Sequence, residues 1–287
     1  MKNFIWLASY PKSGNTMLRL FLSSYFFTSN GILKDFTTLK HITSLNKEDV
    51  LLRFNDHLDI LSRLRDNPDQ ISEYWKQIQE EIISKEKNKI FFIKTHNANI
   101  TYKNNEFTNN EFTKCFVYIV RDPRSVLLSM MDHYNFNSFD QAKKYLMSDK
   151  AITIVNNNLL PEIMLSWKSN YLSWKNFLKD NDDIGIVVKY ENMVKQPEVT
   201  FFNTLKFICE KNNLKIDKKK FSNSLESINF NKLRKMENEK QFPESVRGNQ
   251  KFFRKGIVDE WKDRLPKNII IEIEKEYEDV LRELKYI

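Results

Sequence analysis

The chain has 287 residues, of which 41% are hydrophobic and 13% aromatic, with only five glycines and seven prolines. This composition excludes disordered, collagen-like and low-complexity proteins, and a chain of this length can bury a substantial core. The formal net charge of +8 suits an anionic ligand, an acidic substrate or a nucleic acid equally well, so charge alone selects no function.

Four short apolar runs predict buried strands, and they are Phe4 to Ala8, Ile90 to Ile93, Phe116 to Val120, and Ile184 to Val188. Their length and their β-branched and aromatic content are typical of strands covered on both faces. Amphipathic stretches long enough for crossover helices separate them, such as Met17 to Phe27, Tyr74 to Lys85, Ser125 to Tyr134, and Pro161 to Leu178. The alternation predicts a P-loop-like, three-layer α/β fold in which helices flank a central, mainly parallel sheet.

Polar and reactive side chains directly follow each predicted strand. The four segments are Ser9-Tyr10-Pro11-Lys12-Ser13-Gly14, Lys94-Thr95-His96, Arg121-Asp122-Pro123-Arg124-Ser125, and Lys189-Tyr190-Glu191-Asn192. In open α/β sheets, ligands bind beyond the carboxyl ends of the strands. We therefore expect the four segments to line one crevice.

Nothing in the sequence divides the chain, so we expect residues 1–287 to form a single domain. Cys115 and Cys209 lie in apolar neighbourhoods, which favours buried thiols in a reducing compartment. The first apolar run is too short for a signal peptide, and no segment approaches the ~18 apolar residues of a membrane span. We expect a cytoplasmic protein without stable membrane insertion.

The basic run from Lys218 to Lys220 is not accompanied by any nucleic-acid-binding motif, so we expect no nucleic-acid partner.

The turn after the first predicted strand reads YPKSGNT, residues 10–16. Backbone N–H groups at such a helix start, with the positive end of the helix dipole behind them, form a cradle for an anion. The turn differs from the nucleotide-triphosphate loop G-x-x-x-x-G-K-[ST], because Lys12 precedes Gly14 and Asn15 occupies the lysine position. Taken alone, the segment is also compatible with an ordinary strand-to-helix turn.

YPKSGNT resembles the 5′-phosphosulfate loop of the cytosolic sulfotransferase family, usually YPKSGTTW, and further segments agree with that family in the same order. KTH, ending at His96, resembles the segment with the family's catalytic histidine. VRDPRSVLLS, with Arg121 eight residues before Ser129, resembles the segment that grips the 3′-phosphate of the donor. YENM at Tyr190 resembles YEDM, whose tyrosine contacts the adenine, and Arg254-Lys255-Gly256 resembles the carboxy-terminal phosphate clamp. The matched segments extend from residue 5 to residue 262.

The resemblance implies an enzyme that transfers a sulfuryl group in line from 3′-phosphoadenosine 5′-phosphosulfate (PAPS) to a hydroxyl or amine acceptor, with 3′-phosphoadenosine 5′-phosphate (PAP) as product. It implies that His96 is the general base, that Lys12 and Lys94 stabilise developing charge, and that Ser129 helps to position Lys12. The cofactor-binding residues that it implies are Lys12, Ser13, Gly14, Asn15, Thr16, Met17, Arg121, Ser129, Tyr190, Arg254, Lys255 and Gly256.

Three further expectations concern departures from the family and missing signals. Met17 stands where relatives carry a tryptophan that stacks on adenine, so donor affinity is lower or another aromatic side chain substitutes. No metal is required, because lysine and helix-terminal N–H groups replace Mg²⁺ and no His/Cys cluster has ligand spacing. Asp263 to Asn268 lacks the family's dimerisation pattern, which leaves monomer and homodimer open. The acceptor is not identified.

Two alternative functions remain open from the sequence. The first is a P-loop kinase of small molecules, disfavoured by the displaced Lys12. The second is a catalytically inactive nucleotide-binding protein, which only Met17 suggests and which would have no need of His96.

Overall fold

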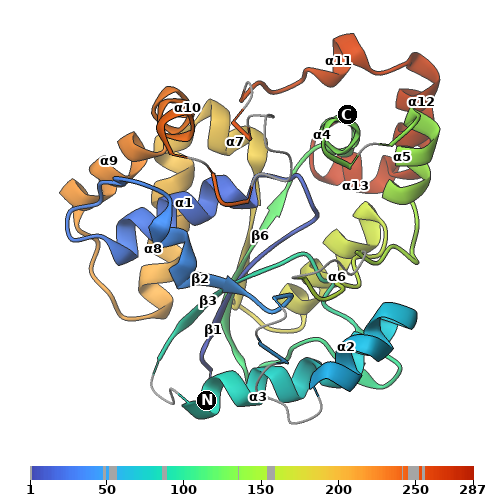
Figure 1. Cartoon of the computed structure of the whole chain (residues 1–287). Helices are drawn as coiled ribbons and strands as arrows, with labels where there is room; N and C mark the ends of the chain where they lie inside the picture. The colour runs from blue at the N-terminus through green and yellow to red at the C-terminus, as the bar shows by residue number, and fades with distance from the viewer. Residues whose placement is uncertain are drawn as a thin grey trace.

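Strands and helices alternate along the chain in the computed structural model, which describes residues 2–47, 50–51, 57–85, 89–134, 136–153, 159–240, 242–244, 252–253 and 256–287 (Figure 1). Two residues of the predicted clamp, Arg254 and Lys255, lie outside the described residues.

Five parallel strands form the central sheet, in the order β2 (Ile42–Ser44), β3 (Phe91–Thr95), β1 (Phe4–Ser9), β6 (Thr113–Val120) and β7 (Gly185–Lys189). The four predicted strands are confirmed. The sequence analysis missed β2, because three residues at a sheet edge are too few to form a recognisable pattern. A separate antiparallel hairpin joins β4 (Thr101–Tyr102) and β5 (Asn105–Glu106).

Helices cover both faces of the sheet, which confirms the three-layer prediction (Figure 1). One layer contains α1 (Asn15–Phe27), α7 (Tyr190–Lys195), α8 (Pro197–Lys211), α9 (Lys218–Ser227) and α10 (Phe230–Glu239). The other contains α2 (His57–Asp66), α3 (Trp75–Lys85), α4 (Pro123–Tyr134), α5 (Phe139–Leu146), α6 (Trp167–Lys179), α11 (Trp261–Arg264), α12 (Lys267–Glu276) and α13 (Glu278–Glu283). Two 3₁₀ segments, Thr37–His41 and Pro68–Tyr74, complete the elements described.

The central strand β1 explains why the apolar runs in the sequence are continuous. Phe4 and Trp6 pack into the hydrophobic cluster on one face of the sheet, whereas Ile5 and Leu7 pack into the cluster on the other. Successive side chains of a strand point to opposite faces, so a strand covered on both sides needs apolar residues at every position.

Helix α6 begins at Trp167 rather than at Pro161, where the sequence analysis placed its start. The hydroxyl of Ser166 caps the helix by accepting a hydrogen bond from the backbone N–H of Ser169 at 3.1 Å. The residues before this cap are not helical, and Ile163 forms an isolated antiparallel bridge with Ile152. This arrangement carries Glu162 to the carboxyl end of β3, where its side chain contacts Lys94.

The remaining predictions about the chain concern its thiols and its surface. Cys115 and Cys209 are both buried and unpaired, as predicted. In the run Lys218 to Lys220, Lys218 and Lys219 are exposed and Lys220 is half-buried. Within the part of the chain that the structure describes, no helix combines the length and the apolar character needed to cross a membrane.

Candidate active site

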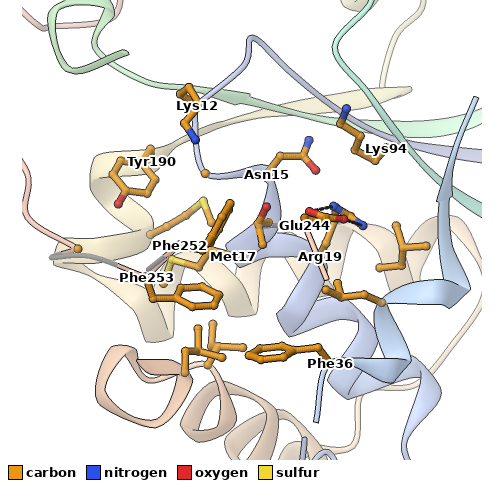
Figure 2. Close-up of a pocket in the computed structure, with 18 of the residues that line it drawn as sticks. Lys12, Asn15, Met17, Arg19, Phe36, Lys94, Tyr190, Glu244, Phe252 and Phe253 are labelled. Atoms are coloured by element: carbon orange, nitrogen blue, oxygen red, sulfur yellow. Dashed lines mark hydrogen bonds and ion pairs between the residues drawn. The ribbon is translucent and has the colours of Figure 1, made fainter. Parts of the chain in front are cut away.

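A cavity of about 2170 Å³ lies where the strands of the sheet end (Figure 2). Single small-molecule sites occupy ≈ 300–1,000 Å³, so this cavity has room for a large ligand and a second one beside it. All four predicted segments contribute to its wall, which confirms that they converge. The predicted site residues in the wall are Lys12, Gly14, Asn15, Thr16, Met17, Lys94, His96, Arg121, Ser129, Tyr190 and Gly256.

The turn between β1 and α1 has a backbone that requires glycine. Gly14 has φ +97°, and a β-carbon there would lie only 2.4 Å from Cδ2 of Tyr190. Gly14 is also the N-cap of α1 and supplies no side-chain oxygen to the N–H groups of the first turn. A helix start of this kind is suited to an anionic ligand, which can accept hydrogen bonds from those groups.

Asn15 and Ser13, two residues of this turn that were predicted to bind the cofactor, have side chains in different environments. Nδ2 of Asn15 donates to the carbonyl of Leu7 at 2.8 Å and to Oγ of Ser9 at 3.2 Å, so this side chain ties the turn to β1. Ser13 is buried, and its hydroxyl has no hydrogen-bond partner in the described part of the chain. Any contact of Asn15 with an anion would therefore come mainly from its backbone.

Arg121, Tyr190 and the glycine turn form one packed unit. Nη1 of Arg121 donates to the carbonyl of Lys12 at 2.9 Å, and the guanidinium carbon lies 4.4 Å from the centre of the Tyr190 ring. Nε of Arg121 is buried and has no partner among the described residues. The indole N–H of Trp167 donates to the carbonyl of Arg121 at 3.0 Å, so this buried core tryptophan also supports the site. A partly unpaired guanidinium beside the cradle suits a second phosphate.

Hydrogen bonds at three positions hold His96 in place. Its Nδ1 lies 2.7 Å from the carbonyl oxygen of Ser9, and its backbone N–H donates to Oε1 of Glu162 at 2.6 Å. Its own carbonyl accepts from Nδ2 of Asn170 at 2.9 Å. A carbonyl oxygen only accepts, so Nδ1 must carry the proton and Nε2 keeps its lone pair. Nε2 of the neutral ring can therefore accept a hydrogen bond or a proton.

The pKa of His96 lies well below the value near neutrality of an ordinary imidazole. Burial lowers it to about 3, and the charge of Lys94 acts in the same direction. Desolvation and a neighbouring cation both disfavour the protonated imidazolium. The ring is therefore neutral at physiological pH.

Glu162, which no sequence motif indicated, joins the residues at the end of β3. Oε1 lies 3.3 Å from the hydroxyl of Thr95, and Oε2 lies 2.9 Å from Nδ2 of Asn46 and 3.3 Å from Nζ of Lys94. Burial raises the pKa of Glu162, but the charge of Lys94, together with the hydrogen bonds, outweighs burial and lowers it overall. The carboxylate is therefore ionised, and Lys94, predicted to be catalytic, is its ion-pair partner.

Arg19 and Glu244 form a second ion pair that the sequence analysis missed, with a buried arginine and an exposed glutamate, and Figure 2 shows it in the cavity wall. Nη1 of Arg19 lies 3.0 Å from Oε2 of Glu244, and Nη2 lies 2.8 Å from Oε1. Arg19 stands four residues after Asn15 on α1, so both face the cavity. In the sequence, only the charge of Arg19 and its spacing from the glycine turn could have indicated a residue of the cavity. No local pattern marks Glu244, its partner 225 residues later.

Aromatic side chains line the part of the cavity near Lys12 and Met17. Nζ of Lys12 lies 5.4 Å from the centre of the Phe252 ring. Phe230 packs against Gly256, where a β-carbon would lie 3.0 Å from its ring. Met17, Tyr190, Phe230 and Phe252 belong to the same hydrophobic cluster and line the cavity together. The missing tryptophan at position 17 therefore does not leave this end of the cavity without aromatic surfaces.

Comparisons with known proteins agree with this geometry. Residues 2–285 match the family described as the sulfotransferase domain. The structure of mouse sulfotransferase SULT7A1 complexed with PAP has 18% sequence identity and a TM-score of 0.59, covering 98% of this chain and 84% of that chain. Retinol dehydratase in complex with androsterone and inactive cofactor PAP has 16% identity and a TM-score of 0.62, covering 97% of this chain and 80% of that chain. No curated protein matches the sequence. The solved structures share the fold.

Proposed function

The chain belongs to the sulfotransferase family, and from that premise we propose that its cavity binds PAPS and transfers the sulfuryl group to a hydroxyl or amine of an acceptor. The observation that carries the proposal is the hydrogen bond between Nδ1 of His96 and the carbonyl of Ser9. It ties a neutral base to the strand end that leads into the anion cradle. The comparisons give no support to a kinase or to an inactive nucleotide-binding protein.

Each part of the donor has a complementary group in the cavity. The cradle at Gly14, with Lys12, would hold the 5′-phosphosulfate. Arg121, whose Nε has no partner among the described residues, would hold the 3′-phosphate with Ser129. Tyr190 and the nearby aromatic rings would contact the adenine. Gly256 lines the same end of the cavity, which supports a role for the clamp that contains it.

The transfer proceeds in one displacement at sulfur. The acceptor oxygen or nitrogen forms a bond to sulfur as the bond from sulfur to the bridging oxygen of the 5′-phosphate breaks. The proton of the acceptor passes to Nε2 of His96, and PAP leaves with the extra negative charge. Lys12 stabilises that charge, and Lys94 stabilises the sulfuryl oxygens, an effect largest in the transition state.

The acceptor end of the cavity has a mixed character. Tyr134, Phe136 and Tyr145 contribute aromatic surface, while Asn46 and Thr153 contribute polar groups. Solved relatives hold androsterone or retinol, according to their descriptions. We propose a small organic acceptor that carries a hydroxyl or amine group. We also propose that residues 1–287 form one domain, since the family match covers residues 2–285, and that the protein is cytoplasmic, since both cysteines are unpaired.

Donor binding and transfer can be measured separately. We expect PAP to raise the melting temperature of the protein at concentrations where ATP does not, because ATP lacks the 3′-phosphate. We expect ³⁵S transfer from PAPS to members of an acceptor panel, and a His96→Gln variant should be slower by ~10²- to 10⁴-fold with unchanged PAP affinity. Stabilisation by ATP and not by PAP would contradict the proposal.

A further inference from the structure

Glu162 is a buried carboxylate to which the proposed reaction assigns no role. It is 2% exposed, and both of its oxygens accept hydrogen bonds or contact cations. Its partners are the backbone N–H of His96, the hydroxyl of Thr95, Nδ2 of Asn46 and Nζ of Lys94. These groups come from the ends of β2 and β3, the strands on one side of β1. The carboxylate therefore joins the two strand ends that border the acceptor part of the cavity.

The contact with Lys94 determines where that cation lies. The Nζ atom of Lys94 is 3.3 Å from Oε2, and the lysine side chain retains only 15% of its exposed surface. A buried ion pair is costly to form, and removing one partner leaves an uncompensated charge. Lys94 thus has a defined position in the cavity before any donor arrives, since its partner is itself held by Asn46.

The contact with His96 acts on the backbone, not on the ring. Oε1 holds the backbone N–H at 2.6 Å, while Asn170 holds the carbonyl and Ser9 holds Nδ1. The negative charge of Glu162 also favours protonation of His96 and so opposes the effects of burial and of Lys94. Loss of this charge would shift the backbone of His96 and make its imidazole a weaker base.

We propose that Glu162 is a positioning residue for sulfuryl transfer, which holds Lys94 and the backbone of His96 in the geometry that the transferring group requires. The inference rests on the proposed function. Glu162 lies in the cavity wall, but both of its oxygens are engaged by protein groups, and it stays ionised while the acceptor proton moves to Nε2 of His96. Its effect on the rate passes through Lys94 and His96.

A double-mutant cycle tests this role. The variants are Glu162→Gln, Lys94→Met and the combination of both. The readouts are the rate of ³⁵S-PAPS consumption with 4-nitrophenol as acceptor, the calorimetric affinity for PAP, and the preference for PAPS over PAP. We expect Glu162→Gln to lower the rate ~10- to 100-fold and to reduce the PAPS preference, with PAP affinity within about 3-fold of the native value. The double variant should be slower than Lys94→Met by no more than about 3-fold, because the part of the effect that passes through Lys94 is already lost and only the smaller part that passes through the backbone of His96 remains.

Glu191 provides the matched control. It is also a buried carboxylate, which accepts from the backbone N–H of Asp122 at 3.0 Å and from the hydroxyl of Tyr286 at 2.7 Å. Neither of these partners is Lys94 or His96. Glu191→Gln should therefore combine additively with Lys94→Met, because the two sites share no partner.

The outcomes separate the role of Glu162 from the proposed function. Additive losses for Glu162→Gln and Lys94→Met, or a parallel loss of PAP affinity, would overturn the positioning role while leaving the function intact. Absence of PAP binding to the native chain would overturn the function itself. If Glu162→Gln does not fold, the comparison of Lys94→Met with the double variant replaces the cycle, since the double variant contains neither the lysine nor the carboxylate and leaves no unpaired buried charge. A double variant more than 10-fold slower than Lys94→Met would contradict the proposal.

Discussion

The bond from Nδ1 of His96 to the carbonyl of Ser9 decides which ring nitrogen can act as a base. A histidine in the sequence has two nitrogens and two neutral tautomers, and only its partner in space selects between them. The same limit applies to Asn15, whose side chain turns to Leu7 and Ser9. At this scale, the sequence predicted most of the side chains that line the cavity around the glycine turn but not which of their atoms face it.

The pKa of His96 gives the native protein a particular dependence of stability on pH. With a folded pKa of about 3 against the ordinary value of 6.5, the unfolded chain binds a proton between these pH values that the folded chain does not. The stability is fully present above pH 6.5 and falls as pH decreases from 6.5 toward 3, at up to ~1.4 kcal/mol per pH unit. Urea unfolding at pH 7 and pH 5 should show a smaller difference for His96→Gln than for the native chain. The exposed His41, substituted as His41→Gln, is the control and should leave the difference unchanged.

Gly14 should tolerate no side chain. In Gly14→Ala, the β-carbon would collide with the ring of Tyr190 and the residue would be held at φ +97°. We expect a loss of PAP affinity of at least ~100-fold, because the ring and the cradle cannot both keep their places. Calorimetry checks this. Gly31→Ala is a matched control: its φ is +79° and its β-carbon would meet the carbonyl of Lys220 at 2.3 Å, and neither of these two residues lines the cavity. It should lower stability without changing PAP affinity; equal losses of affinity in both variants would argue against a local effect.

At the scale of elements, contacts between segments far apart in the chain complete the cavity. Helix α1 brings Arg19 to Glu244, and the extended segment before α6 brings Glu162 to the end of β3. The sequence analysis placed Glu162 inside a helix, because the stretch from Pro161 to Leu178 is amphipathic and long enough for a crossover helix. Ser166 is the actual cap, so the preceding residues are released from the helix.

The ion pair between Arg19 and Glu244 should couple α1 to the segment 242–244. Arg19 is 6% exposed, whereas the Glu244 side chain is 40% exposed. Losing the ion-pair partner therefore costs more free energy for Arg19, whose charge stays buried, than for Glu244. We expect Glu244→Gln to destabilise the protein by about 1–2 kcal/mol, and Arg19→Gln/Glu244→Gln to recover part of that loss. Urea unfolding measures both. Asp69→Asn removes the partner of the more exposed Lys103 and should cost less than about 1 kcal/mol. A double variant less stable than the sum of its singles would refute the coupling.

At the scale of the whole molecule, the parallel order of the sheet explains why one ligand can contact distant parts of the chain. The carboxyl ends of β2, β3, β1, β6 and β7 meet at one edge, where the cavity lies. The residues around this edge range from the first turn of α1 to Gly256. Donor binding should therefore stabilise several segments at once.

Hydrogen exchange tests that expectation. PAP should slow exchange in residues 12–19, 121–129 and 190–194, because these segments line the same cavity from three different elements. The β4–β5 hairpin, which contributes no residue to the cavity wall, should exchange at the same rate with and without PAP. Protection confined to the first segment would mean that PAP does not reach Arg121 and Tyr190.

The sequence by itself determined the α/β class, four of the five strands of the sheet and the four segments at their ends. Such features depend on local patterns: a strand covered on both faces is apolar at every position, and a glycine turn must precede a helix in the chain. Tertiary structure alone decided the tautomer and the neutral state of His96, the pairing of Lys94 with Glu162, and that of Arg19 with Glu244. These depend on distances between residues 9 and 96, 94 and 162, or 19 and 244, and on the burial that surrounds them. No local pattern carries that information, because an ion pair or a desolvated imidazole exists only once the chain has brought its parts together.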